Sequence, residues 1–153
     1  MPADYALPVA VPAAPRELSR DEIDAFLRSQ RVARLGCHSG GETYVVPVIY
    51  GYDGGSVVAV TTEGRKIAML RANPRVCVEV DEYDADGRGS WRSVIAQGLF
   101  EELAGAEVGP ALDLLRGRFT SAAGRAPERR PAGPGVVVFR VRLRETTGRA
   151  VER

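Results

Sequence analysis

The sequence predicts a mainly β protein with flanking helices, built as one domain around about six antiparallel strands. Its 153 residues, 44% apolar and 27% charged, have the length and composition of a single globular domain. About six segments are rich in β-branched or alternating apolar residues, whereas only three have a helical repeat. The strand-like segments mostly follow one another through short turns, which favours an antiparallel sheet. Closing so many short strands into a small barrel would also remove exposed edges.

The first predicted element is a short amphipathic helix over residues 20–29. Ser19 and Glu22 match a capping box, in which the two residues satisfy each other's backbone N–H groups. Three apolar residues then share one helical face, which we expect to pack on the sheet. These residues are Ile23, Phe26 and Leu27.

Three strand-like segments come next, at residues 32–37, 43–55 and 56–62. Asp53-Gly54-Gly55 separates the last two and predicts a hairpin turn. Pro47 cannot donate a ladder hydrogen bond, so we expect its strand to be irregular or partly unpaired at its middle. Such irregularity would leave neighbouring backbone groups free for another partner.

The second half of the chain repeats this alternation of helix and strand. A second helix ends at Asn73, because the residue before a proline avoids the α region. A strand over residues 75–83 leads through a loop at 84–90, long enough to be mobile, into a strand over 91–103. Gly98 interrupts that strand and predicts a β-bulge.

The last elements are a helix over residues 107–124, a Pro- and Gly-rich loop, and a strand over 135–149. The final strand alternates strictly between apolar and basic side chains, which predicts one buried face and one solvated face. The apolar set is Phe139, Val141 and Leu143, and the basic set is Arg140, Arg142 and Arg144.

The bulk properties exclude several classes of protein. A net charge of +1 provides no general attraction to nucleic acid or to an anionic membrane. Cys37 and Cys77 have neither a disulfide framework nor metal-ligand spacing, so we expect no metal site and a reducing, cytoplasmic setting. Residues 1–17, rich in Pro and Ala, lack the pattern of a signal peptide. We expect them to form a flexible arm before a single domain over 18–153.

Arg65 and Lys66 stand at the start of the second helix, where the helix dipole makes cations unfavourable. Together with Thr61 and Thr62 at the preceding strand end, they would place hydroxyls, cations and free N–H groups around one point. That combination predicts a phosphate site, although the P-loop pattern is absent.

The alternative interpretation is that Arg65 and Lys66 are solvated surface residues. In that case Glu63 or Glu101 would be their ion-pair partner. Spacing alone does not separate these two interpretations.

Four sequence segments, taken together and in order, resemble a known family. They are the capped helix followed by "VARLGC", then "YVVPVIYGYDGG", "TTEGRKIAMLRANPRVCVEVDE" and "WRSVIAQGLFEEL", with a final strand ending "TGR". This order is similar to that of the flavin-binding split-barrel proteins of the pyridoxamine 5'-phosphate oxidase-like superfamily. The small single-domain branch, which includes the nitroimidazole-resistance reductases, is the nearest in form.

The resemblance implies a six-stranded antiparallel split β-barrel that forms a homodimer, with FMN in a groove between the subunits. Arg65 and Lys66 would hold the FMN phosphate, and Ser93 would reach it from a neighbouring strand. Backbone groups of four residues on the second strand-like segment would face the flavin ring, namely Val46, Pro47, Val48 and Ile49, and Thr61 and Thr62 would lie beside the cofactor at a strand end. Apart from the resemblance, the ring of Tyr50 could stack near the cofactor, or it could equally be a core aromatic.

The function implied is an FMN-dependent oxidoreductase that transfers hydride between the flavin and a small organic or nicotinamide substrate. No residue in the sequence stands out as an acid, base or nucleophile, and His38 is the only histidine. Ala59 stands where some reductases of this branch carry a histidine. The chain also ends at "TTGRAVER" without the C-terminal Arg and His segment of the true oxidases, so oxidation of pyridoxamine phosphate is not expected.

Two alternatives remain open at this point. The first is a flavin- or haem-binding module without turnover, for which an axial haem ligand would have to come from a Cys, His or Tyr residue. The second is a deazaflavin-dependent reductase, because a deazaflavin shares the ring and first phosphate of FMN. Its longer tail would need a basic surface, for which Arg125, Arg129 and Arg130 are the candidates.

Overall fold

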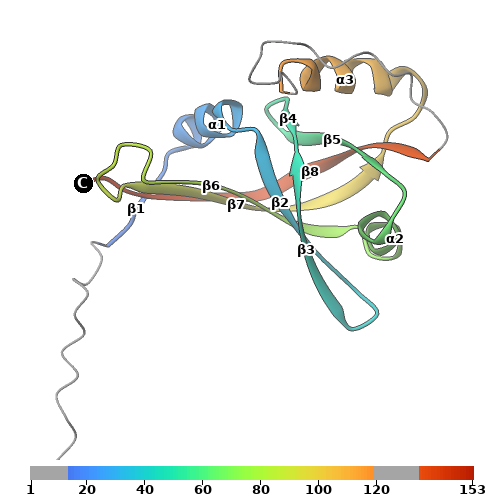
Figure 1. Cartoon of the computed structure of the whole chain (residues 1–153), viewed down its shortest axis with the longest axis horizontal. Coiled ribbons are helices and arrows are strands. Elements are labelled where there is room, and N and C mark those ends of the chain that lie inside the picture. Colours follow the sequence, from blue (N-terminus) through green and yellow to red (C-terminus); the bar gives the residue numbers. More distant parts are fainter. Residues whose placement is uncertain (1–13, 119–134) are drawn as a thin grey trace, which may run out of the picture.

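A single antiparallel sheet dominates the computed structural model, which describes residues 14–118 and 135–153 (Figure 1). The sheet has the strand order β3-β2-β6-β7-β8-β5-β4, and β1 pairs with β8. It curls into a half-barrel, and its edge strand β3 also contacts β5. The strands are β1 (Arg16–Glu17), β2 (Val32–Ser39), β3 (Glu42–Ile49), β4 (Gly51–Tyr52), β5 (Ser56–Thr62), β6 (Arg75–Tyr83), β7 (Trp91–Glu102) and β8 (Val136–Val151). Six of these eight strands are long, as the predicted six-stranded split barrel requires.

Three α-helices flank the sheet in the described part of the chain: α1 (Arg20–Ser29), α2 (Arg65–Ala72) and α3 (Val108–Arg116). The helix α2 packs against β2, whereas α3 packs against β5. No helix in the described residues is long and apolar enough to cross a lipid bilayer.

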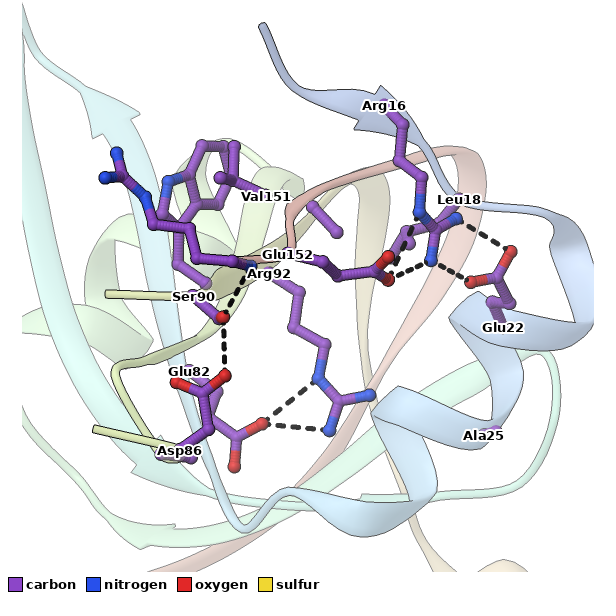
Figure 2. Close-up of a pocket in the computed structure, with 14 residues that line it drawn as sticks. Arg16, Leu18, Glu22, Ala25, Glu82, Asp86, Ser90, Arg92, Val151 and Glu152 are labelled. Atoms are coloured by element: carbon purple, nitrogen blue, oxygen red, sulfur yellow. Dashed lines mark hydrogen bonds and ion pairs between the residues drawn. The ribbon is translucent and has the colours of Figure 1, made fainter. Parts of the chain in front are cut away.

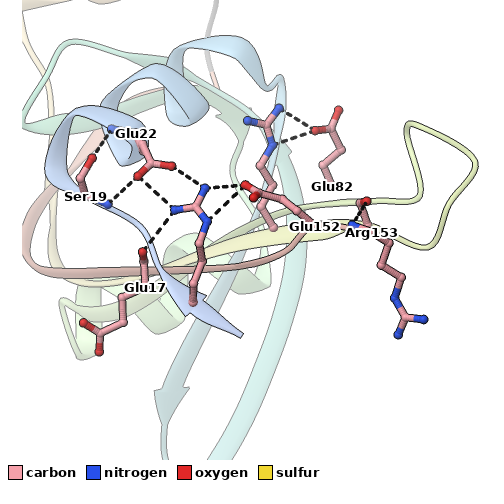
Figure 3. Close-up of polar contacts among 9 residues, drawn as sticks. Glu17, Ser19, Glu22, Glu82, Glu152 and Arg153 are labelled. Carbon is pink, nitrogen blue, oxygen red and sulfur yellow. Dashed lines mark hydrogen bonds and ion pairs between the residues drawn. The ribbon is translucent and has the colours of Figure 1, made fainter. Parts of the chain in front are cut away.

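The capping box of α1 is confirmed. The Ser19 hydroxyl accepts a hydrogen bond from the Glu22 N–H at 3.2 Å, and the Glu22 carboxylate accepts one from the Ser19 N–H at 3.2 Å (Figure 3). The predicted apolar face of α1 is buried. Local sequence therefore determines where this helix begins and how it meets the sheet.

Both turn and bulge signals are confirmed as well. The Asp53 carboxylate accepts hydrogen bonds from the N–H groups of Gly55 and Ser56 at 2.9 and 2.7 Å, which closes the β4–β5 hairpin. The register between β7 and β8 shifts at Gln97/Gly98. A Cβ on Gly98 would lie 2.5 Å from a methyl group of Val141, so the bulge needs a glycine there.

The prediction about Pro47 is wrong. The strand β3 pairs with β2 without a break from Ile49 to Glu42, and Pro47 lies opposite Arg34 in that register. Because β3 is the edge strand of the sheet, a residue without an N–H fits there without disturbing the ladder.

Three boundaries differ from those predicted. Arg16 and Glu17 form β1 against β8, so paired backbone begins inside the predicted arm, and residues 1–13 lie outside the described part. The helix predicted over 107–124 ends at Arg116, before Gly117, and residues 119–124 again lie outside it. The final strand continues to Val151, and the predicted alternation holds over residues 139–144 but not along the whole strand.

The two faces of the sheet differ in burial. The inner face carries the main core, including Leu35, Val78, Val80 and Val141. Residues on the other face of β2, β3, β6 and β7, here called the outer face, alternate with this core and include large exposed apolar side chains. These are Val32, Val45, Ile49, Tyr83 and Ile95, which are 44%, 62%, 37%, 70% and 47% exposed.

Candidate cofactor site

The N-terminus of α2 lacks the usual cap. Its N-cap residue, Gly64, is extended and has no side chain to accept a hydrogen bond, and the first turn contains no acidic residue. The first helical hydrogen bond runs from the Ala68 N–H to the Gly64 carbonyl at 3.1 Å. The N–H groups of residues 65–67 therefore have no helical acceptor, and a partial positive charge remains at this end.

Lys66 adds a full positive charge at the same place. It is the only lysine in the sequence, and its side chain is half-buried. Within the described residues it forms no hydrogen bond or ion pair. Its ammonium group is thus available to an anion.

Arg65 is held differently. Its guanidinium lies 4.8 Å from the centre of the Tyr44 ring and forms an ion pair with the carboxylate of Glu42. Both partners lie in the first half of β3, just after the turn that joins it to β2. The sequence did not point to either of them, although Tyr44 alternates with Val46 and Val48 on one face of the strand.

The acidic partners predicted for a plain surface role are engaged elsewhere. Glu63 accepts two hydrogen bonds from Arg71 at 2.7 and 2.8 Å, and this contact lowers the pKa of its carboxyl group. Glu101 pairs with Arg140 and Arg142 instead. The ion pair between Glu63 and Arg71 also ties the turn before α2 to the helix itself.

Thr61 and Thr62 lead directly into this turn from the end of β5. Thr62 is exposed, whereas Thr61 is half-buried, and both pair with the first residues of β8. Both residues lie within four positions of the start of α2, and a role for their hydroxyls at a cofactor stays a prediction.

The predicted ring-facing segment lies on β3, next to Tyr44. Val46 and Val48 are half-buried and pack against the core, whereas Pro47 and Ile49 point to the exposed outer face. One edge strand thus carries both the residues that contact Arg65 and the segment assigned to the cofactor ring.

Tyr50 does not belong with this set. Its side chain is fully buried, and its hydroxyl donates a hydrogen bond to the Leu27 carbonyl at 2.6 Å. Burial raises the pKa of the phenol. Tyr50 is therefore a core residue that anchors α1, and the expectation that its ring contacts a cofactor is corrected.

Ser93 lies far from Arg65 within one chain. The Arg65 guanidinium lies over the ring of Tyr44, so the position of Tyr44 in the sheet locates it. Tyr44 pairs with Cys37, which in turn pairs with Val76 at the start of β6. Ser93 pairs with Asp81, five residues further along β6. At about 3.4 Å per residue, this separation is roughly 17 Å along the strand. One chain alone does not bring Ser93 to the end of α2.

The remaining candidates for chemistry are few. His38 is exposed, and its Nδ1 lies 3.1 Å from the Thr43 hydroxyl. Cys37 is buried, which raises the pKa of its thiol. No group of three His, Cys, Asp or Glu residues in the described part could hold a metal ion. The arginines proposed for a deazaflavin tail, at 125, 129 and 130, lie outside the described residues.

A cavity of about 440 Å³ lies at the other end of the sheet (Figure 2). It is formed by α1, the loop at 84–90 and the ends of β7 and β8. Arg16 bridges Glu22 and Glu152 at 2.8 and 2.5 Å along one side of it. The cavity contains none of the residues predicted to bind a cofactor.

Comparison with known proteins identifies the family. The family described as pyridoxamine 5'-phosphate oxidase matches residues 19–150, and the chain belongs to this family. An uncharacterized protein of Rhizobium meliloti (strain 1021) is 31% identical over 88 residues, which are 58% of this chain and 57% of that protein. The chain thus matches little more than half the length of that relative.

Three solved structures share the fold. A FAD-binding protein from Mesorhizobium loti is 33% identical, with a TM-score of 0.73 over 92% of this chain and 100% of that chain. A protein from Bacteroides thetaiotaomicron described as a candidate 5-nitroimidazole antibiotic resistance protein is 24% identical, with a TM-score of 0.70 over 92% and 93%. A heme-binding protein from Mycobacterium smegmatis is 20% identical, with a TM-score of 0.69 over 94% and 55%. The family thus has both flavin- and haem-binding fold neighbours.

Proposed function

We propose that this protein binds a flavin nucleotide, FMN or FAD, with its first phosphate at the N-terminus of α2. The observation that carries this proposal is Lys66, which has no partner in the described residues and stands beside uncapped backbone N–H groups. A phosphate would accept from those N–H groups and from Lys66 at once. The residues present therefore fit the group that the family implies.

The ring of the flavin would lie along β3. Val46 and Val48 provide apolar contact, and an edge strand has backbone groups on its open side that no neighbouring strand occupies. A bound flavin supplies the redox chemistry, by hydride transfer with a small organic or nicotinamide substrate. This chain would anchor the phosphate, orient the ring and exclude water from one side of it.

Two of the candidate axial haem ligands are inaccessible, which favours a flavin. A haem needs an axial ligand that faces an open site. Cys37 and Tyr50 are buried, and burial raises the pKa of both side chains. His38 is exposed near the end of β2, where its Nδ1 lies 3.1 Å from the Thr43 hydroxyl and its carbonyl accepts a hydrogen bond from Asn73.

The proposed active form is a homodimer joined through the outer face. The apolar residues exposed there would be buried by a second copy of the same surface. Ser93 belongs to that face, because it alternates with the buried Val94 on β7. If Ser93 and Lys66 hold one phosphate, as the family pattern implies, the 17 Å separation estimated from strand geometry requires that they come from different subunits.

The test is the substitution Lys66→Ala, measured with FMN and with riboflavin, which has no phosphate. Losing a hydrogen bond to a charged group costs about 1.5–3 kcal/mol, so FMN affinity should fall about ten- to a hundred-fold. Riboflavin affinity and the melting temperature should not change. Arg75→Ala removes another exposed cation and serves as the control.

Selective labelling provides a second measurement, since Lys66 is the only lysine. FMN should protect its amine from acetylation, as read by mass spectrometry, whereas riboflavin should not. If Lys66→Ala binds FMN as tightly as the wild type, the phosphate is not held at this helix and the proposal fails.

A further inference from the structure

The outer face carries an unused group of nucleotide-binding side chains just beyond Ser93. In the sheet register, Ser93 lies directly opposite Arg149 of β8. Two residues further along β7, Trp91 lies directly opposite Tyr83 of β6. Directly opposed residues on one face of a sheet have Cβ atoms about 5 Å apart. These four residues therefore form one patch, here called the aromatic platform.

The side chains of this platform are available. Tyr83 is 70% exposed, and Trp91 is half-buried. Arg149 is exposed and forms no ion pair with any residue in the described segments. By contrast, the neighbouring Arg92, on the inner face, is already paired with Glu82 at 2.9 Å.

The chemistry of the platform matches a nucleotide. Aromatic side chains stack on bases of any kind, and an unpaired guanidinium binds a phosphate through two parallel hydrogen bonds. Trp91 also lines the 440 Å³ cavity, which lies between the end of the sheet and α1.

We infer that the aromatic platform binds the adenylyl half of FAD, whose flavin half is held by the partner subunit. This inference rests on the proposed flavin site and its dimer. Ser93 would contact the first phosphate, and Arg149 the second. The adenine would stack on Trp91 and Tyr83, which lie two residues, or about 7 Å, beyond Ser93 along the strands. FMN has one phosphate and no adenine, so it would contact Ser93 but neither Arg149 nor the two aromatic rings. The platform would therefore favour FAD over FMN.

The test compares FAD with FMN in the full-length protein. Arg149→Ala and Tyr83→Ala change exposed side chains, so the fold should be retained. Because Tyr83 also belongs to the outer face proposed to join the dimer, light scattering must show that each variant is still a dimer. Each should weaken FAD binding about ten-fold and leave FMN affinity within about two-fold of the wild type. Arg144→Ala, on the same strand, removes another exposed arginine that has no ion pair in the described residues and should change neither affinity.

A second readout uses Trp91, the only tryptophan in the sequence. ADP does not absorb tryptophan emission, so it should quench Trp91 fluorescence only by stacking close to the indole. Tyr83→Ala and Arg149→Ala should both weaken this quenching.

The outcomes separate the two hypotheses. If FAD and FMN bind equally well, or if the two variants weaken both alike, the aromatic platform is not an adenylyl site, while the phosphate site at α2 stands. If the wild type binds neither flavin, the proposed function itself is wrong and this inference falls with it.

Discussion

At the scale of single residues, Arg65 differs from Lys66 because its guanidinium is already engaged by other side chains of the chain. Its guanidinium already has an anionic partner in the chain, the carboxylate of Glu42, and rests on the ring of Tyr44. Both members of the ion pair are more than half exposed, so the pair is weak. A phosphate must therefore compete with Glu42 for Arg65, but not for Lys66.

This competition predicts the effect of Glu42→Gln. Removing the competing charge should strengthen FMN binding about two- to five-fold, because exposed ion pairs contribute about 0.2–1 kcal/mol. Riboflavin should bind as in the wild type, since it has no phosphate to gain from the change. Isothermal titration of both ligands provides the measurement, with the exposed Glu17→Gln as control. Weaker FMN binding would instead mean that Glu42 orients Arg65 for the phosphate.

The sequence pointed to those residues of this candidate site that have a local signal, and not to those that the fold brings in from a distant strand. Lys66 and Arg65 were found because their position at a helix start is a local signal. Glu42 and Tyr44 lie some twenty residues earlier, and only the curl of the sheet brings their strand to α2. Tyr50 was misjudged because β-branched and aromatic residues beside a cofactor and in a core have the same pattern in sequence.

At the scale of elements, the long pair formed by β7 and β8 depends on one bulge. At Gly98 the ladder shifts by one residue, and the backbone there approaches β8 closely. A Cβ at this position would lie 2.5 Å from a Val141 methyl group and 2.7 Å from the Arg142 carbonyl oxygen. The second contact is with backbone, which cannot move aside as a flexible side chain would.

We therefore expect Gly98→Ala to destabilise the protein by about 1–3 kcal/mol, the usual cost of overpacking a well-filled interior. Urea unfolding followed by circular dichroism would measure the difference in free energy. Gly109→Ala is the matched control, because a Cβ in that part of α3 meets no atom within 4 Å. Alanine favours a helix by about 1 kcal/mol over glycine, so the control should be neutral or stabilising. Equal stability of the two variants would show that β7 and β8 can separate at the bulge.

Elements were predictable where their signals were local. The capping box at Ser19, the hairpin at Asp53 and the helix end at Asn73 each depend on neighbouring residues, and each is present in the structure. Pro47 was misread because its meaning depends on whether its strand is central or at an edge. That property belongs to the sheet order and not to the strand.

At the scale of the whole molecule, the half-barrel leaves one broad face of the sheet without cover. The split-barrel class could be predicted because the order of strands, turns and helices is characteristic of the family. The dimer was implied by that resemblance alone, and it stays a prediction. The exposed apolar side chains of the outer face provide its physical basis, and they share that face with the ion pairs of Arg34 with Glu79 and Asp81.

Ile95 is the best position to test this dimer. It lies on β7 between Ser93 and Gln97, and 47% of its surface is exposed. A glutamate in its place would bury an unpaired charge in the interface, which is far more costly than leaving it in water. We expect Ile95→Glu to shift the protein from dimer to monomer by light scattering. The monomer should still unfold in one cooperative thermal transition, because the inner core is unchanged.

The same variant links assembly to cofactor binding. If Ser93 reaches the phosphate held by the other subunit, separating the subunits should weaken FMN binding even though Arg65 and Lys66 are untouched. Ala104→Glu adds the same charge at an exposed position outside the sheet and should preserve both the dimer and the affinity. A wild-type monomer that binds FMN tightly, or an Ile95→Glu dimer, would contradict the proposed assembly. If the monomer binds FMN tightly, Ser93 is not a phosphate ligand, because within one chain it lies too far from α2.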